Sequence, residues 1–140
     1  MIMPYLTFSG DCEEAFLWYE KIFNGKIQHM SKYGDIPENP DTPMSAEQKS
    51  KVMHAQLMLT ENGGISGADA LWPIEKGGAV SIHAHLPNEE LARKVFSALS
   101  ENGNVLGALA TNPPPDDSGI SGSVRDKYGF TWIVSALKSK

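Results

Sequence analysis

Apolar and polar residues alternate along several short segments of the chain, which is the pattern of a half-buried β-strand. In residues 52–59, every second side chain from Met53 to Leu59 is apolar, and the side chains between them mix polar and flexible apolar groups. Residues 5–8 and 81–86 alternate in the same way. The pattern predicts a sheet with one apolar face against helices and one polar-lined, concave face.

The alternation assigns each strand residue to one of these two faces. The residues expected against the helices are Leu6, Phe8, Met53, Ala55, Leu57, Ile82 and Ala84. The residues expected to line the concave face and to bind a ligand there are Tyr5, Thr7, His54, Gln56, His83 and His85. Trp132 is expected on the helix side, because its neighbours have the parity of the concave face. A slip of one residue would exchange all of these assignments.

Two amphipathic helices are punctuated by capping residues and glycine. In the first, Asp11 and Glu14 fit a capping box and Gly25 a C-terminal stop. Its apolar stripe consists of Ala15, Phe16, Tyr19, Ile22 and Phe23. In the second, Asn88 can cap the N-terminus and Gly103 ends the helix. Its stripe consists of Leu91, Val95, Ala98 and Leu99.

The two helices belong to a pattern that occurs twice, about 78 residues apart. Each copy has a short strand, a helix and an Asn-Gly turn that leads into further strands. One copy cannot close its own core, so we expect the two to pair and to form a cavity where their sheets meet. Further strands are expected over residues 26–33, 64–68, 105–110 and 130–136. Residues 34–51, with a helical turn at 45–49, and residues 111–122 are expected to be irregular loops, either lids, dimer arms or plain surface.

Composition predicts one globular domain of 140 residues in the cytoplasm. Hydrophobic residues make up 41% and charged residues 21%, and the net charge of −5 without a basic cluster argues against nucleic-acid binding. No apolar run approaches 18 residues, so no membrane span is expected. The single cysteine, Cys12, excludes an internal disulfide. The helix dipole would favour its thiolate, but no histidine is placed to activate it, so a packed thiol is preferred.

Four groups of residues resemble one known family. They are Pro4-Tyr5-Leu6-x-Phe8-x-Gly10, Glu14-Ala15 with Trp18-Tyr19-x-x-x-Phe23, Met53-His54-Ala55, and Asp126-Lys127-Tyr128-Gly129-Phe130-x-Trp132. This set is similar to the PhnB-like branch of the vicinal oxygen chelate superfamily, which also holds glyoxalase I, extradiol dioxygenases and the bleomycin and fosfomycin resistance proteins.

The resemblance implies an α+β fold of two paired βαβββ modules that form a cup-shaped mixed sheet backed by helices, the glyoxalase/bleomycin resistance fold. It places the modules at residues 1–76 and 77–140 of a single domain and implies a homodimer. The branch has often carried a demethylubiquinone methyltransferase label, but the sequence has no Gly-x-Gly-x-x-Gly turn after a strand to support a nucleotide cofactor.

Metal-dependent members of the superfamily supply a His in the first strand, a Glu at the end of the first module, a second His and a Glu in the last strand. The matching positions here hold Tyr5 (Pro4 if the register slips by one), Asp69 as a candidate, His83 and Ile133. Tyrosine must lose a proton of pKa near 10 to bind a metal, and isoleucine cannot bind one. We therefore expect no catalytic metal and no other cofactor.

Two functions of different class remain open. The first is a metal-independent protein that binds a small apolar or oxygen-rich molecule in the cup. The second is a metal-dependent glyoxalase- or dioxygenase-type enzyme acting on a substrate with neighbouring oxygens, with His54 or His83 in acid–base catalysis. An equally good interpretation of His54 is a structural histidine whose hydrogen bonds are made by its neighbours. No role is predicted for His29.

Overall fold

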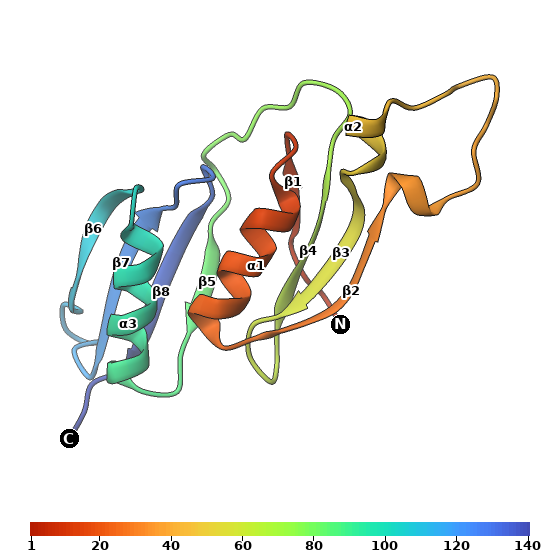
Figure 1. Cartoon of the computed structure of the whole chain (residues 1–140). Coiled ribbons are helices and arrows are strands. Elements are labelled where there is room, and N and C mark those ends of the chain that lie inside the picture. Colours follow the sequence, from red (N-terminus) through yellow and green to blue (C-terminus); the bar gives the residue numbers. More distant parts are fainter. The chain divides into compact units, whose positions relative to one another are not determined.

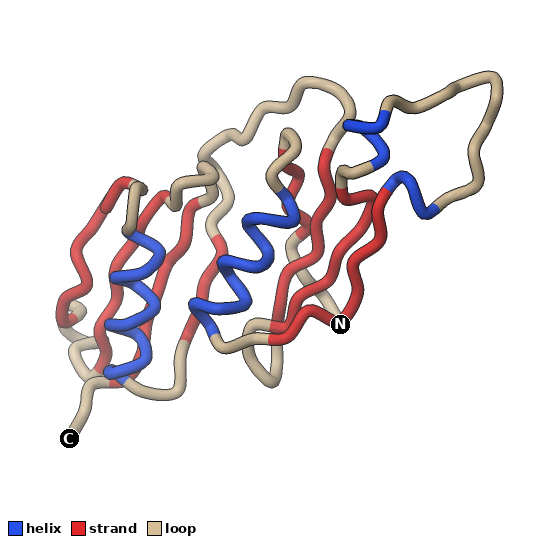
Figure 2. The backbone as a smooth tube through the Cα atoms, viewed as in Figure 1, coloured by secondary structure: helices blue, strands red, loops and turns tan.

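The computed structural model describes all 140 residues, which form two compact units at residues 1–75 and 76–140. Each unit is a four-stranded mixed sheet with a long helix against one face (Figures 1 and 2). No helix in the chain is both long enough and apolar enough to cross a membrane.

The first unit has the sheet order β1-β4-β3-β2. Its elements are β1 (Tyr5–Phe8), α1 (Cys12–Phe23), β2 (Lys26–Lys32), the 3-10 turn η1 (Tyr33–Asp35), α2 (Ala46–Lys49), β3 (Val52–Met58) and β4 (Gly64–Asp69). β1 and β4 are parallel, whereas the other neighbouring strands are antiparallel.

The second unit repeats this topology with the sheet order β5-β8-β7-β6. Its elements are β5 (Ile82–His85), α3 (Glu89–Ser100), β6 (Asn104–Thr111), β7 (Gly119–Arg125) and β8 (Thr131–Leu137). β5 and β8 are the parallel pair. Each unit therefore has the order βαβββ, apart from the short turns, and the predicted α+β fold class is confirmed.

The N-termini of α1 and α3 are capped differently. The Asn88 side chain accepts a hydrogen bond from the Leu91 N–H at 2.8 Å, as predicted. The predicted Asp11 cap is wrong, because the Asp11 side chain makes no capping bond. Instead, Oδ1 of the buried Asp69 at the end of β4 accepts the Cys12 N–H at 3.0 Å. A side chain more than fifty positions away in the sequence thus accepts a hydrogen bond from a backbone N–H at the start of the helix.

The alternation of buried and exposed residues follows the predicted parity in most of the strands. Leu6 and Phe8 are buried, whereas 54% of Tyr5 is exposed. The Phe8 ring packs edge-on against Phe16 of α1, with ring centroids 5.9 Å apart. Trp132 is fully buried in β8 and donates its indole N–H to the Asp126 carboxylate.

The start of β3 departs from this parity. Val52 is fully buried and Met53 is only half-buried, although Met53 was predicted against the helix. The β2–β3 ladder shifts register between Ser31 and Lys32, opposite this end of the strand. Such a shift moves side chains from one face to the other. β5 keeps the predicted parity with less complete burial, because Ile82 and Ala84 are half-buried whereas His83 and His85 are exposed.

One strand was missed in the sequence. Residues 111–122 were predicted as a loop, but β6 extends to Thr111 and β7 begins at Gly119. β7 contains two glycines and two serines, residue types that are common in turns. The structure gives a packing reason for glycine there: a Cβ on Gly122 would lie 2.9 Å from the Phe96 ring of α3. A small residue lets the helix pack closely on the strand.

Candidate functional site

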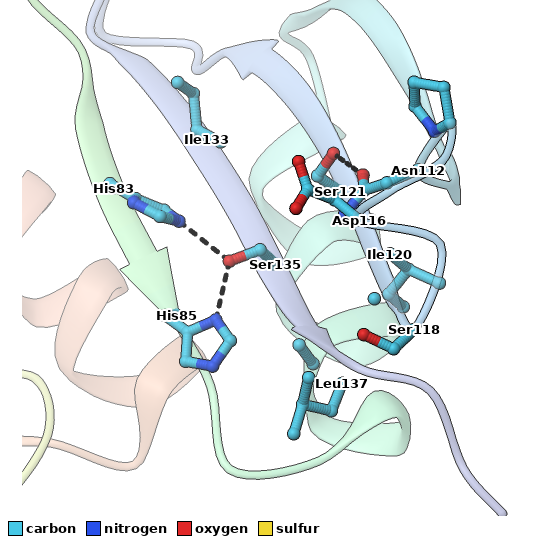
Figure 3. Close-up of a pocket in the computed structure, with 13 residues that line it drawn as sticks. His83, His85, Asn112, Asp116, Ser118, Ile120, Ser121, Ile133, Ser135 and Leu137 are labelled. Carbon is cyan, nitrogen blue, oxygen red and sulfur yellow. Dashed lines mark hydrogen bonds between the residues drawn. The ribbon is translucent and has the colours of Figure 1, made fainter.

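A pocket of about 520 Å³ lies over the second unit, between the loop that precedes β7 and the sheet face away from α3 (Figure 3). Its lining combines polar side chains with an apolar wall. The polar side chains are those of His83, His85, Asn112, Asp116, Ser118, Ser121 and Ser135, and the wall includes Ile120, Ile133 and Leu137. No lysine or arginine lines this pocket.

Strand pairing explains why two histidines and a serine meet in the pocket. His85 of β5 lies beside Ser135 of β8, and His83 lies beside Ile133, two residues earlier on the same face. The His83 Nε2 lies 2.7 Å and the His85 Nδ1 2.9 Å from the Ser135 Oγ. Figure 3 shows both rings converging on this hydroxyl.

The shared hydroxyl couples the two rings chemically. Ser135 has one hydroxyl proton, so it donates to one histidine and accepts an N–H from the other. When both rings are neutral, the remaining nitrogen of the first ring carries a proton and that of the second carries a lone pair. The pair therefore offers a ligand one donor and one acceptor.

The rim of the pocket is held by the turn between β6 and β7. The Ser121 hydroxyl donates to the Asn112 side-chain oxygen. The backbone N–H of Asn112 donates to the Gly119 carbonyl at 2.9 Å, which closes the turn. The Asp116 side chain also lines the pocket and supplies the one carboxylate of the lining.

A second polar cluster lies on the sheet of the first unit. The Tyr5 Oη is 3.1 Å from the His54 Nδ1, and the two rings stack with centroids 5.7 Å apart. The His29 ring also contacts His54, again with centroids 5.7 Å apart. Burial is the main cause that raises the pKa of Tyr5, followed by the nearby Cys12 and Tyr33, so its phenol is neutral.

The structure brings four of the six predicted ligand-binding residues together in two pairs. His83 and His85 line the pocket of the second unit, and Tyr5 contacts His54 in the first unit. Thr7 and Gln56 are half-buried in β1 and β3. Sequence reasoning missed Ser135, Asn112, Ser121, Asp116 and His29.

Ser135 could have been found from the sequence, because it shares the parity of Ile133 in a predicted strand. His29 could not be found this way, since β2 changes register between Ile27 and His29.

The divalent ion that the superfamily's fold implies does not fit the residues present. His83 on β5 lies beside Ile133 on β8, and at the equivalent place in the first unit Tyr5 on β1 lies beside Ser66 on β4. Neither strand pair therefore offers a second strong ligand. Asp69, the candidate carboxylate, instead accepts backbone N–H bonds, namely those of Gly10, Cys12 and Val52 at 2.9–3.0 Å. No group of three or more His, Cys, Asp and Glu side chains has metal-binding geometry.

Cys12 is a packed thiol rather than a reactive one. Its side chain is fully buried in the first turn of α1. Burial is the largest cause that raises the thiol pKa, and the carboxylates of Asp69, Asp11 and Glu13 raise it further. The expected favourable effect of the helix dipole on the thiolate is therefore outweighed.

Comparison with solved structures identifies the class of fold. A point mutant of the fosfomycin resistance protein FosX from Listeria monocytogenes, solved with Mn(II) and 1S,2S-dihydroxypropylphosphonic acid, aligns with a TM-score of 0.62 at 11% identity, over 100% of this chain and 92% of that protein. The chain thus has the glyoxalase/bleomycin resistance fold of the vicinal oxygen chelate superfamily.

The family is also established. The profile of the family described as 3-demethylubiquinone-9 3-methyltransferase matches residues 1–135, and the chain belongs to this PhnB-like family. Protein PA1353 from Pseudomonas aeruginosa is 29% identical and covers 99% of this chain and 98% of its own, with a TM-score of 0.82. A PhnB protein from Bacillus cereus, described as a putative 3-demethylubiquinone-9 3-methyltransferase, is 23% identical with the same coverage and a TM-score of 0.74.

Proposed function

We propose that this protein binds a small, uncharged molecule carrying hydroxyl or carbonyl groups, without the divalent ion used elsewhere in the superfamily. The observation that carries the proposal is the convergence of His83 and His85 on the Ser135 hydroxyl inside a pocket of about 520 Å³. A cavity of this size with a few convergent polar groups is typical of small-molecule sites.

The lining of the pocket supports this class of ligand. Each of the two histidines has a ring nitrogen left for a ligand, and together these nitrogens can donate one hydrogen bond and accept another. Ile120, Ile133 and Leu137 supply apolar surface beside these groups. The one formal charge of the lining, on Asp116, disfavours a phosphonate or carboxylate ligand.

The reaction in the family's name is not part of this proposal. Nucleotide-type cofactors bind in doubly wound parallel sheets at a glycine-rich turn before a helix. The sheets of this protein are mixed, and each has the order of a βαβββ unit.

Acid–base catalysis by His83 on a bound ligand is the second candidate function, because its Nε2 already shares a hydrogen bond with Ser135.

A fragment screen by ligand-observed NMR tests the proposal. Neutral hydroxyl and carbonyl fragments should bind the native protein, and Ile133→Trp, which fills the pocket, should abolish their binding. Leu17→Trp is the matched control, because Leu17 is an exposed aliphatic residue on α1 in the other unit. Fragments that bind Ile133→Trp as well as they bind the native protein would show that this pocket is not the site. Preferential binding of anionic fragments would overturn the proposed ligand class.

We also propose that the protein is a homodimer. β6 is an edge strand of the second sheet, and Val105 and Leu106 on it are 47% and 50% exposed. An apolar edge strand favours cover by another chain. Light scattering should give about twice the mass of 15.2 kDa at micromolar concentration, and a monomer mass would reject the dimer.

A further inference from the structure

Three side chains from three different strands meet on the sheet of the first unit and serve no part of the pocket proposed above. They are Tyr5 of β1, His54 of β3 and His29 of β2, and we refer to them as the Tyr5–His54–His29 cluster. β2 and β3 are antiparallel neighbours, with His29 opposite Gln56 and His54 opposite Ser31. The two histidines are therefore diagonal neighbours across the ladder, within reach of one another.

The spacing of these groups fits coordination of one ion. The Tyr5 Oη and the His54 Nδ1 are 3.1 Å apart. Two ligand atoms that each lie about 2.0–2.1 Å from a metal are separated by about 3.1 Å when the angle between them is about 100°. The ring centroids of His29 and His54 are 5.7 Å apart. Each imidazole centroid lies about 3.2 Å from a bound metal, so this separation corresponds to an angle of about 125° between the two rings at the ion.

We propose that the Tyr5–His54–His29 cluster is a binding site for a transition-metal ion of the Cu(II) class. Two imidazoles and a phenolate are ligands for copper rather than for Mg²⁺ or Ca²⁺, and Cu(II) binds such sets most strongly among the divalent first-row ions. The ion displaces the phenolic proton of Tyr5, since a bound cation reverses the local preference for the neutral phenol. More than half of Tyr5 is exposed, so water can complete the coordination sphere.

Tyr5 stands at the superfamily's first-strand ligand position, but the other two ligands of this site differ from those of the superfamily. It uses both histidines of the first unit, and neither His83 nor Ile133 takes part. It also shares no residue with the small-molecule pocket, whose lining residues all belong to the second unit.

The test is a titration of metal-stripped protein, prepared without an affinity tag, with Cu(II) chloride. Calorimetry should show one Cu(II) per chain, and a phenolate-to-copper absorption band should appear in the visible spectrum. His54→Asn and His29→Asn should each weaken binding tenfold or more. Tyr5→Phe should remove the band while weaker binding persists. The variant with both His83→Asn and His85→Asn is the matched control, because it removes the other two histidines of the chain and should bind Cu(II) like the native protein.

Several outcomes would overturn the site. Loss of binding only in the double His83/His85 variant would place the ion in the second unit. Unchanged binding in both His54→Asn and His29→Asn would assign the ion to other groups, such as the N-terminal amine. A visible band that survives Tyr5→Phe would exclude the phenolate ligand. Circular dichroism of each variant verifies that a loss of binding is not a loss of fold.

Discussion

The two units have the same backbone topology but differ in the chemistry of their sheet faces. Their strand orders and parallel pairs correspond one to one. Where the first unit has Tyr5 beside Ser66, the second has His83 beside Ile133. The first face carries a cluster of three rings, whereas the second forms a pocket around Ser135. The comparison shows that the βαβββ unit fixes which positions face outward from the helix and leaves their chemistry free.

The largest expected effect concerns one buried carboxylate in each unit. Asp69 accepts hydrogen bonds from three backbone N–H groups. Asp126 accepts two backbone N–H groups and the Trp132 indole N–H. Asp69→Ala and Asp126→Ala should each lower the free energy of unfolding by about 3–5 kcal/mol, because buried donors lose a charged acceptor. Urea denaturation measures this loss.

The exposed Asp41→Ala serves as the control for both variants and should change stability by less than about 0.5 kcal/mol. A loss below about 1 kcal/mol in Asp69→Ala would show that the carboxylate does not hold the start of α1. Separate unfolding transitions in one variant would show that the two units unfold independently.

A smaller effect is expected at the turn after each long helix. Asn24 and Asn102 have left-handed backbone, with φ of 52° and 56°, and a glycine follows each. A Cβ on Gly25 would lie 2.3 Å from the Met58 carbonyl oxygen, and one on Gly103 would lie 2.5 Å from that of Arg125. Gly25→Ala and Gly103→Ala should therefore each destabilise the protein by about 1–3 kcal/mol, as overpacking does.

Gly63→Ala is the control, because a Cβ there meets only the Thr60 hydroxyl at 4.0 Å. Thermal unfolding of the three variants measures the difference. Equal losses of stability in Gly25→Ala and Gly103→Ala would show that the turns of the two units are equivalent. No loss of stability in Gly103→Ala would show that they are not.

Much of the fold could be predicted from the sequence because burial in strands and helices is periodic. The parity of β1, the capping of α3 by Asn88 and the burial of Trp132 followed from local patterns. The cap of α1 could not be predicted, because Asp69 reaches it from another strand. Such contacts depend on the register of a sheet, which local patterns do not contain.

The candidate site was predictable only in part, for the same reason. His83 and His85 share a strand, so their common face was apparent. Their meeting at Ser135 depends on the pairing of β5 with β8. His29 belongs to the Tyr5–His54–His29 cluster because the pairing of β2 with β3 shifts in register before His29. This shift breaks the simple alternation of side chains between the two sheet faces.

A third expected effect is a pH dependence of stability that arises in the first unit alone, because only this unit contains a cysteine. The pKa of the Cys12 thiol is raised in the folded protein, whereas it is about 8.5 in an unfolded chain. Above that pH the unfolded chain loses the thiol proton and the folded protein keeps it. This contribution to stability is therefore complete below pH 8.5 and falls as the pH rises, by up to about 1.4 kcal/mol per pH unit.

Cys12→Ala removes this ionisation and isolates it from that of other groups. The variant should be less stable than the native protein at pH 7, because a buried side chain is truncated. The difference should narrow between about pH 8.5 and pH 10. Urea denaturation at several pH values measures it, and parallel curves would contradict a buried, neutral thiol.

The smallest expected effect is that of a chelator on stability. Neither unit offers a carboxylate at the position where the superfamily binds its ion, since Ser66 and Ile133 occupy the two places beside Tyr5 and His83. Each sheet is covered by a helix with buried apolar residues, so neither core depends on a metal. EDTA should therefore change the melting temperature by less than about 2 °C, and added Mn(II) should not raise it. Differential scanning calorimetry on tag-free protein provides the measurement. A larger fall that Mn(II) reverses in the native protein but not in His83→Ala would restore the metal-dependent enzyme as the function, with the ion bound in the second unit.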